Sequence, residues 1–201
     1  SLIDADRTDT AEFERGCAAR LRSRWKYQSW KLVAERLEAH LVTLKTRNDV
    51  DVIRREISSR CKEFADREKG FYQLTVPTGG GKTLASLRFA INHARKHRMD
   101  RVIYVAPYIS ILDQNARVAR AIFDRATERP IVLEQHSNLA PEAATRQDEM
   151  LAENWDAPLV FTTAVQLLEA LFGGGTRRVR SMHQLANAVI ILDEAQTLPI
   201  K

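Results

Sequence analysis

Residues 75–83 read TVPTGGGKT, and this glycine-rich stretch decides the fold class. It follows a short apolar run and opens a segment with the apolar spacing of an amphipathic helix. Consecutive glycines let backbone N–H groups close around phosphate oxygens, because no side chain blocks their approach. Lys82 adds a positive charge for the terminal phosphates, and Thr83 offers Mg²⁺ a hydroxyl ligand. The pattern predicts a P-loop that binds a nucleoside triphosphate with magnesium.

The residues predicted to bind ATP are consecutive in the chain. A strict P-loop has a glycine six positions before its lysine, where this sequence has Val76. The alternative is a glycine-rich turn followed by an incidental Lys-Thr pair. The flanking strand and helix patterns favour the P-loop, since the start of a helix attracts anions. The predicted ATP-binding residues are Pro77, Thr78, Gly79, Gly80, Gly81, Lys82 and Thr83.

A second motif lies far downstream, where the apolar run 189–192 leads into the sequence DEAQ at 193–196. A buried strand that ends in two acids delivers their carboxylates to the edge of a sheet, where a magnesium-bound nucleotide sits in such folds. Asp193 is predicted to bind Mg²⁺ through water, and Glu194 to polarise the attacking water. Alone, this pair of acids would be an ordinary strand end. Together with the P-loop, it predicts nucleotide hydrolysis.

The composition is that of one globular core with an appendage. The chain has 201 residues, of which 44% are hydrophobic and 28% charged. The two cysteines are too few for a disulfide framework, and no stretch has the length of a membrane span or the pattern of a signal peptide. We therefore expect a cytoplasmic protein. The net charge of +5 is compatible with a polyanionic partner.

The hydrophobic rhythm changes near residue 70. Residues 11–66 have helical spacing, with Asn48 as a predicted cap and Gly70 as the predicted end, whereas short apolar runs and helices alternate afterwards. This alternation predicts an α/β fold, a parallel sheet covered by helices on both faces. It divides the chain into a helical segment, 1–69, and a sheet domain, 70–201. The predicted strands are 71–76, 101–106, 130–134, 158–161 and 188–192, and the helices 82–97, 109–125, 141–153 and 163–172.

Two histidines on the predicted helix 82–97 have the spacing of a metal pair. His93 and His97 lie four residues apart, but Arg95 and Lys96 surround them with positive charge. We interpret the pair as a solvated helix end.

The order of the motifs resembles that of superfamily 2 helicases. Residues 77–83 look like motif I, and 193–196 look like motif II of the DEAD/DEAH type. Between them, VAPYISILDQN at 105–115 is similar to motif Ia, and VFTTAVQLL at 160–168 to the next nucleic-acid motif. The resemblance implies that the sheet domain is the first RecA-like lobe of a helicase.

A narrower resemblance is to the CRISPR-associated helicase-nucleases of type I interference systems. It rests on VPTGGGKTLASL at 76–87, EQHSN at 134–138, LANA at 185–188 and LDEAQTLP at 192–199. It implies an ATP-driven motor on single-stranded DNA, recruited by a guide-RNA surveillance complex to degrade target DNA. Catalysis would fall to Lys82, Glu194 and Gln196, the last standing where many relatives have histidine.

The intermediate motifs imply nucleic-acid contacts. Side chains that follow the carboxyl ends of two strands could grip a sugar-phosphate backbone without reading its sequence. Spacing alone favours helix capping for the serine and threonines. The residues implied by the resemblance are Pro107, Ser110, Gln114, Thr162 and Thr163.

The chain begins at Ser1 and ends five residues after the acidic motif, so we expect part of a longer polypeptide. A second RecA-like lobe and a nuclease domain have no counterpart in it. Two alternatives remain open. One is a module that binds ATP and DNA, or docks a partner, without hydrolysis. The other is the motor lobe of a different superfamily 2 translocase.

Overall fold

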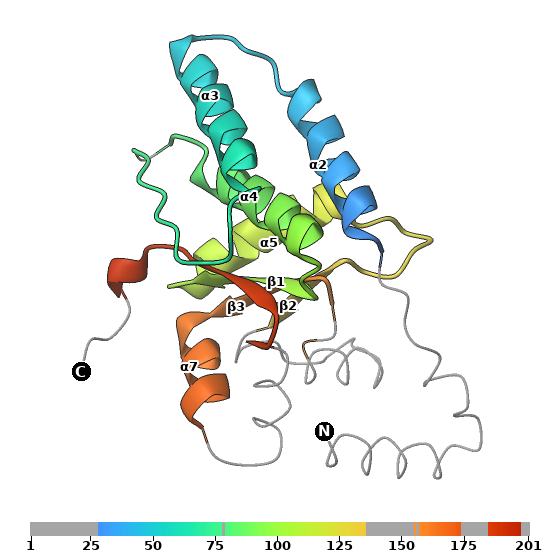
Figure 1. Cartoon of the computed structure of the whole chain (residues 1–201), viewed down its shortest axis with the longest axis vertical. Coiled ribbons are helices and arrows are strands. Elements are labelled where there is room, and N and C mark those ends of the chain that lie inside the picture. The colour runs from blue at the N-terminus through green and yellow to red at the C-terminus, as the bar shows by residue number, and fades with distance from the viewer. Residues whose placement is uncertain (1–27, 78, 136–154, 156, 174–184, 198–201) are drawn as a thin grey trace.

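The described part of the chain is built around one parallel sheet (Figure 1). In the computed structural model the described residues are 28–77, 79–135, 155, 157–173 and 185–197. The strands lie in the order β2-β3-β1-β4, and every neighbouring pair is parallel, which confirms the predicted sheet. The strands are β1 (Arg101–Ala106), β2 (Val132–Gln135), β3 (Leu159–Thr163) and β4 (Ala188–Leu192).

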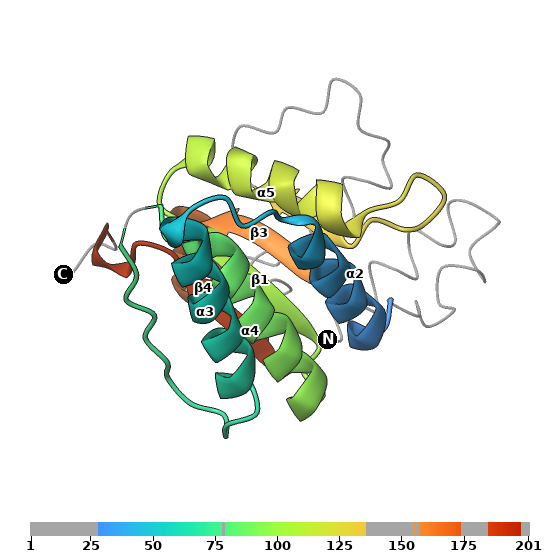
Figure 2. The same cartoon turned by 90° about the horizontal axis from the view of Figure 1, so that it is seen from above.

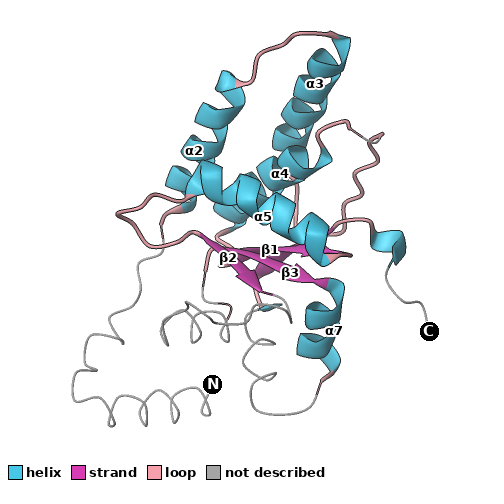
Figure 3. Cartoon of the chain, turned by 180° about the vertical axis from the view of Figure 1, so that it is seen from behind, coloured by secondary structure: helices cyan, strands magenta, loops and turns pink. Residues whose placement is uncertain are grey.

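Helices cover both faces of this sheet. All six residues of the central strand β1 are buried, so its side chains are covered on both faces. Val102 and Tyr104 belong to one hydrophobic cluster, with residues of α2, α4 and α5. Ile103 and Val105 belong to another, with residues of α7. Among the described helices, Figure 3 shows α7 below the sheet and the others above it. The helices are α2 (Trp30–Thr43), α3 (Asp49–Phe64), α4 (Lys82–His97), α5 (Ile109–Phe123) and α7 (Ala164–Phe172).

The strand β2 starts later than predicted. Pro130 has no N–H for a ladder, and Asp124 Oδ1 accepts the next two backbone N–H groups, those of Ile131 (2.7 Å) and Val132 (3.2 Å). The pattern therefore predicted the strand two residues early. The helix 82–97 and the strands 101–106 and 188–192 have their predicted bounds. The helix predicted over 141–153 lies outside the described residues.

The strand predicted over 71–76 is wrong. This segment has no regular secondary structure, and it forms no ladder with the strands of the described part. Side chains hold it instead: the ring of Tyr72 packs on Phe89 of α4 (centroids 5.0 Å apart), and Lys69 Nζ donates to Asn187 Oδ1 (3.3 Å). Phe71 is fully exposed. Apolar spacing marks an extended backbone, but a strand also needs a neighbouring backbone to bond with.

Of the two helices before the P-loop, α2 contributes to the core that covers the sheet, and α3 packs against α4. Figure 2 shows α3 beside α4, with α2 on the same side. Arg88 of α4 joins them: its Nε and Nη2 donate to the two carboxylate oxygens of Glu38 on α2 (2.8 and 2.6 Å), and Nη1 donates to Ser58 on α3 (3.1 Å). Asn48 caps α3 as predicted, since its side chain accepts the N–H of Asp51. The helix ends at Phe64, before Gly70. The division of the chain near residue 70 stays a prediction.

The prediction of a solvated helix end is wrong for His93, whereas His97 is the last residue of α4 and is half-buried. His93 is only 4% exposed, and its Nδ1 lies 2.9 Å from the carbonyl oxygen of Ala65. His97 Nε2 lies 2.7 Å from the carbonyl oxygen of Arg67. Both imidazoles therefore donate to the segment that leads from α3 toward the P-loop. The charged residues next to the histidines in the sequence suggested that the rings face solvent. The carbonyl groups that bind the rings lie about thirty residues earlier, so the local sequence does not reveal them.

The strand β4 borders the sheet in the described part. Its apolar side chains are only partly covered: Ile190 is 41% and Leu192 43% exposed. Within the described residues, no helix is long and apolar enough to cross a membrane.

Candidate nucleotide site

The structure brings the two sequence motifs together at the carboxyl ends of the strands. Lys82 is the first residue of α4, and Glu194 follows β4. Although 112 positions apart in the chain, they form an ion pair in which Lys82 Nζ donates to Glu194 Oε1 at 2.7 Å. Parallel strands end at one edge of a sheet, so residues that follow different strands meet there.

The ion pair sets the charge of both groups. The carboxylate of Glu194 holds the pKa of Lys82 above its usual value, and the ammonium of Lys82 holds the pKa of Glu194 below its usual value. Gln196, on the short helix η2 (Ala195–Thr197), donates its Nε2 to the other carboxylate oxygen of Glu194. The lysine and the predicted base are therefore charged and bound to each other.

The glycines shape the turn before α4. The N–H of Gly80 donates to the carbonyl oxygen of Pro77 (3.0 Å), which closes the turn. A Cβ on Gly80 would lie 2.3 Å from Val76 Cγ1 and 2.9 Å from that same oxygen. Gly81 has φ +77°, a left-handed conformation that side chains disfavour, and leads directly into α4. Thr78 lies outside the described residues.

Arg54 of α3 holds this turn from outside, and the sequence did not single it out. Its Nε donates to the carbonyl oxygen of Gly79 (2.7 Å), and its Nη1 pairs with Asp51 (2.9 Å). Its Cγ would lie 3.4 Å from a Cβ on Gly81. In a trans peptide the C=O and N–H point in opposite directions. By binding the carbonyl of Gly79, Arg54 fixes the direction of the following N–H.

We expect Arg54→Ala to weaken the binding of a nucleoside triphosphate by about two- to tenfold, the worth of one hydrogen bond. The loop would then lose its outer support while keeping all its phosphate-binding groups. Titration with a fluorescent ATP analogue measures the change. Arg60→Ala is the matched control, because Arg60 lies on the same helix and pairs only with Glu56 (2.8 Å) in the described part. An equal loss in both variants would show that the effect is not local.

A second network links the other predicted ligands. The buried hydroxyl of Tyr104, on β1, donates to Asp193 Oδ2 (2.7 Å). Asn115 of α5 donates its Nδ2 to the same hydroxyl (3.3 Å) and accepts from Thr83 Oγ1 (3.4 Å). Burial, followed by the nearby charge of Asp193, raises the pKa of Tyr104, so its hydroxyl stays a donor. Asp193 also donates its backbone N–H to the carbonyl oxygen of Val105 (2.9 Å), which fixes its position.

The residues present fit a magnesium-bound triphosphate. The network joins one carboxylate, Asp193, and one hydroxyl, Thr83, both hard oxygen donors. Mg²⁺ usually binds one or two protein oxygens together with phosphates and water. Lys82 and the start of α4 lie beside these donors and supply positive charge for the phosphates.

The residues predicted to contact nucleic acid differ in accessibility. Ser110 and Gln114 are exposed, one turn apart on α5, and Pro107 is half-buried just after β1. Thr163 is 7% exposed, and its hydroxyl accepts the N–H of Gln166 (3.4 Å), the capping that spacing alone favoured. Thr162 is fully buried. The structure therefore leaves Ser110 and Gln114 as the polar side chains most open to a strand.

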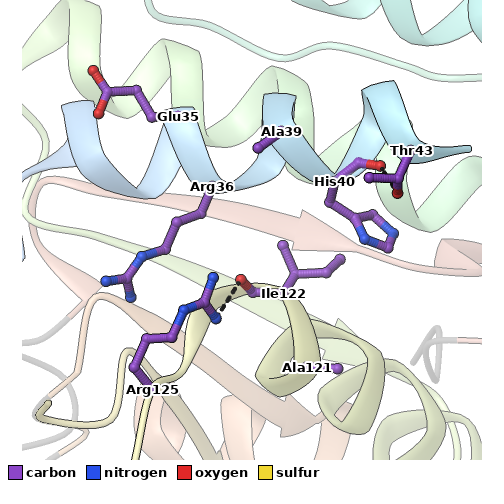
Figure 4. A pocket seen from close by; sticks show the side chains of 8 residues that line it. All are labelled: Glu35, Arg36, Ala39, His40, Thr43, Ala121, Ile122 and Arg125. Atoms are coloured by element: carbon purple, nitrogen blue, oxygen red, sulfur yellow. Dashed lines mark hydrogen bonds between the residues drawn. The ribbon is translucent and has the colours of Figure 1, made fainter. Parts of the chain in front are cut away.

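A pocket of about 420 Å³ lies elsewhere, between α2 and the last turns of α5 (Figure 4). Two arginines line it, but both are already engaged. Arg36 binds the carboxylate of Glu128 (2.6 Å), and Arg125 binds the carbonyl oxygens of Ile122 (3.2 Å) and Asp124 (2.7 Å). These contacts make the pocket a poor site for an anion.

The parallel sheet, the glycine-rich turn before α4 and the acids after β4 together define a RecA-like P-loop domain. The chain belongs to the DEAD/DEAH box helicase family, whose model matches residues 41–199. The resemblance drawn from the motifs is thereby confirmed. Members of this family bind ATP, usually with Mg²⁺.

Among curated proteins, the chain is similar to the CRISPR-associated nuclease/helicase Cas3 of Haloferax volcanii. The two are 33% identical over 151 residues, a match that covers 63% of this chain and 16% of that protein. The chain thus corresponds to a small part of this relative.

Proposed function

We propose that this chain is the ATP-binding lobe of a single-stranded DNA translocase in type I CRISPR antiviral defence. In this proposal it belongs to a larger helicase-nuclease, which a guide-RNA surveillance complex recruits to degrade target DNA. The observation that carries the proposal is the contact between Lys82 and Glu194, because it joins motif I and motif II at one site. The similarity to a protein named nuclease/helicase supports the CRISPR context.

The site residues would divide the work of hydrolysis. Backbone N–H groups of Gly79, Gly81 and Lys82 would surround the phosphates, and the ammonium of Lys82 would neutralise charge on the departing phosphoryl group. Thr83 and Asp193 would hold Mg²⁺, which supplies further positive charge when bound. Glu194 must leave Lys82 before it can orient the attacking water. Gln196 would steady its carboxylate during this exchange.

The DNA strand would lie across the carboxyl ends of β1 and β3. Ser110 and Gln114 would bind its phosphates from the exposed face of α5, while Pro107, Thr162 and Thr163 would shape the strand ends beneath it. Contacts to sugar and phosphate alone would let the motor move over any sequence.

Two measurements test the proposal. The chain itself should bind a fluorescent ATP analogue, and the full-length polypeptide that carries it should hydrolyse ATP faster with single-stranded DNA than with duplex or RNA of the same sequence. Failure to bind nucleotide would overturn the proposal. ATP binding without DNA-stimulated hydrolysis by the full-length polypeptide would favour a non-hydrolysing module. Equal stimulation by duplex DNA would favour a different superfamily 2 translocase.

A further inference from the structure

The hydrogen-bonded chain Asp193–Tyr104–Asn115–Thr83 carries an inference beyond nucleotide binding itself. Its outer members are the predicted magnesium ligands. Of its inner members, Tyr104 precedes the stretch resembling motif Ia and Asn115 ends it, and neither was among the predicted site residues. Tyr104 lies on β1, Asn115 on α5 and Thr83 on α4. These hydrogen bonds therefore join three elements of the fold to Asp193, the acid after β4.

The tyrosine end of this chain is rigid. Tyr104 is 1% exposed, and its ring stacks on Phe161 of β3, with centroids 5.1 Å apart. In the ladder it lies opposite Ile191, two residues before Asp193, so Tyr104 and Asp193 share one face of the sheet. Phenylalanine would fill the same space, and a buried hydroxyl is costly unless it is bonded. The hydroxyl therefore serves to hold Asp193.

The asparagine end is adjustable. The two bonds of Asn115 are 3.3 and 3.4 Å long, near the upper limit of hydrogen bonds, whereas the bond from Tyr104 to Asp193 is 2.7 Å. The amide of Asn115 is therefore held less tightly than the hydroxyl of Tyr104.

Asn115 lies on a helix that is packed into the core. Leu112 and Ala116, on either side of Asn115 in the sequence, are fully buried. The preceding turns of the same helix carry Ser110 and Gln114 on its exposed face. One helix thus presents polar groups both to the surface and to the nucleotide site.

We propose that Tyr104 and Asn115 are positioning residues that set the spacing of Asp193 and Thr83, and that Asn115 ties this spacing to the position of α5. A strand bound on α5 then changes the affinity for magnesium-bound nucleotide, and nucleotide changes the affinity for the strand by the same factor. This inference rests on the proposed function, but its two halves can be measured separately.

Tyr104→Phe tests the first half. We expect it to weaken the binding of a non-hydrolysable ATP analogue about tenfold in the presence of Mg²⁺, the effect of losing a hydrogen bond to a charged group. Binding of the same analogue in EDTA should stay within about twofold, because the phosphates keep their own contacts. Tyr72→Phe is the control, since that hydroxyl binds only the carbonyl oxygen of Glu68 in the described part. Equal losses with and without Mg²⁺ would overturn the role of Tyr104.

Asn115→Ala tests the second half. In the unaltered protein, the ratio of nucleotide affinities with and without single-stranded oligodeoxythymidine gives the coupling factor. We expect this factor to fall toward one in Asn115→Ala, and to persist in Asn92→Ala, whose amide binds only Arg88 of its own helix in the described part. A factor unchanged in Asn115→Ala would overturn the proposal. A coupling factor of one in the unaltered protein would also overturn the link through Asn115, whereas an unaltered protein that binds no nucleotide would contradict the proposed function. Circular dichroism verifies that each variant is folded.

Discussion

Lys82→Ala is expected to weaken ATP binding by about 10- to 100-fold and to reduce ATP hydrolysis by the full-length polypeptide below detection. The ammonium is the only Lys or Arg charge that the described part of the chain pairs with the acids after β4, and charged hydrogen bonds to phosphates are among the strongest. Folding should change little, because Lys82 and Glu194 are about one third exposed and water screens their attraction. Isothermal titration with ATP and Mg²⁺, together with phosphate release, measures both effects.

The companion variant Glu194→Gln separates binding from chemistry. It removes the carboxylate that occupies Lys82 in the absence of nucleotide, so ATP affinity should stay equal or rise while hydrolysis is lost. Lys31→Ala is the control for charge alone, because Lys31 pairs only distantly with Glu35 (4.0 Å) on the surface of α2. If Glu194→Gln lost affinity as severely as Lys82→Ala, the ion pair would be part of the binding site and not its competitor.

Gly80→Ala is expected to cost about as much nucleotide affinity, for a steric reason. The added methyl group would meet Val76 Cγ1 at 2.3 Å and the carbonyl oxygen of Pro77 at 2.9 Å, so the turn must open. Strain of about 1–3 kcal/mol at a ligand-binding turn corresponds to an affinity loss of about 5- to 150-fold. Fluorescence titration with an ATP analogue measures it.

Two further variants make this result specific. Gly70→Ala should bind normally, since a Cβ there meets no atom within 4 Å. Val76→Ala combined with Gly80→Ala removes the closer of the two clashes and should restore part of the affinity. Unchanged affinity in Gly80→Ala would mean that the turn adopts another conformation when nucleotide binds.

The groups proposed to act on nucleotide were predictable because each sits at a motif position, and the structure brings Lys82 and Glu194 together. Lys82 follows consecutive glycines, and Glu194 follows an apolar strand, so local sequence carries their signal. The parallel sheet was predictable for the same reason, from alternating apolar runs. The predicted strand over 71–76 failed because its formation depends on a neighbour that no local pattern reveals.

The supporting residues were not predictable from one sequence. Arg54 precedes the P-loop by more than twenty residues and reaches it only because α3 packs against α4. Tyr104 has the appearance of an ordinary core residue in a buried strand, and only its register beside β4 places the hydroxyl on Asp193. Asn115 lies within the stretch resembling motif Ia, yet only the packing of α5 turns its amide inward.

The partly covered isoleucine and leucine on β4 have a practical consequence for anyone who purifies this chain. Within the described residues, the outer edge of β4 bonds to no further strand, and such an edge flanked by apolar side chains attracts other strands, including those of neighbouring molecules. Concentrated samples will tend to self-associate along this border, and raised salt will strengthen the tendency, because it screens the repulsion between positively charged molecules. Low protein concentration and modest ionic strength are therefore the conditions under which binding constants will describe single molecules.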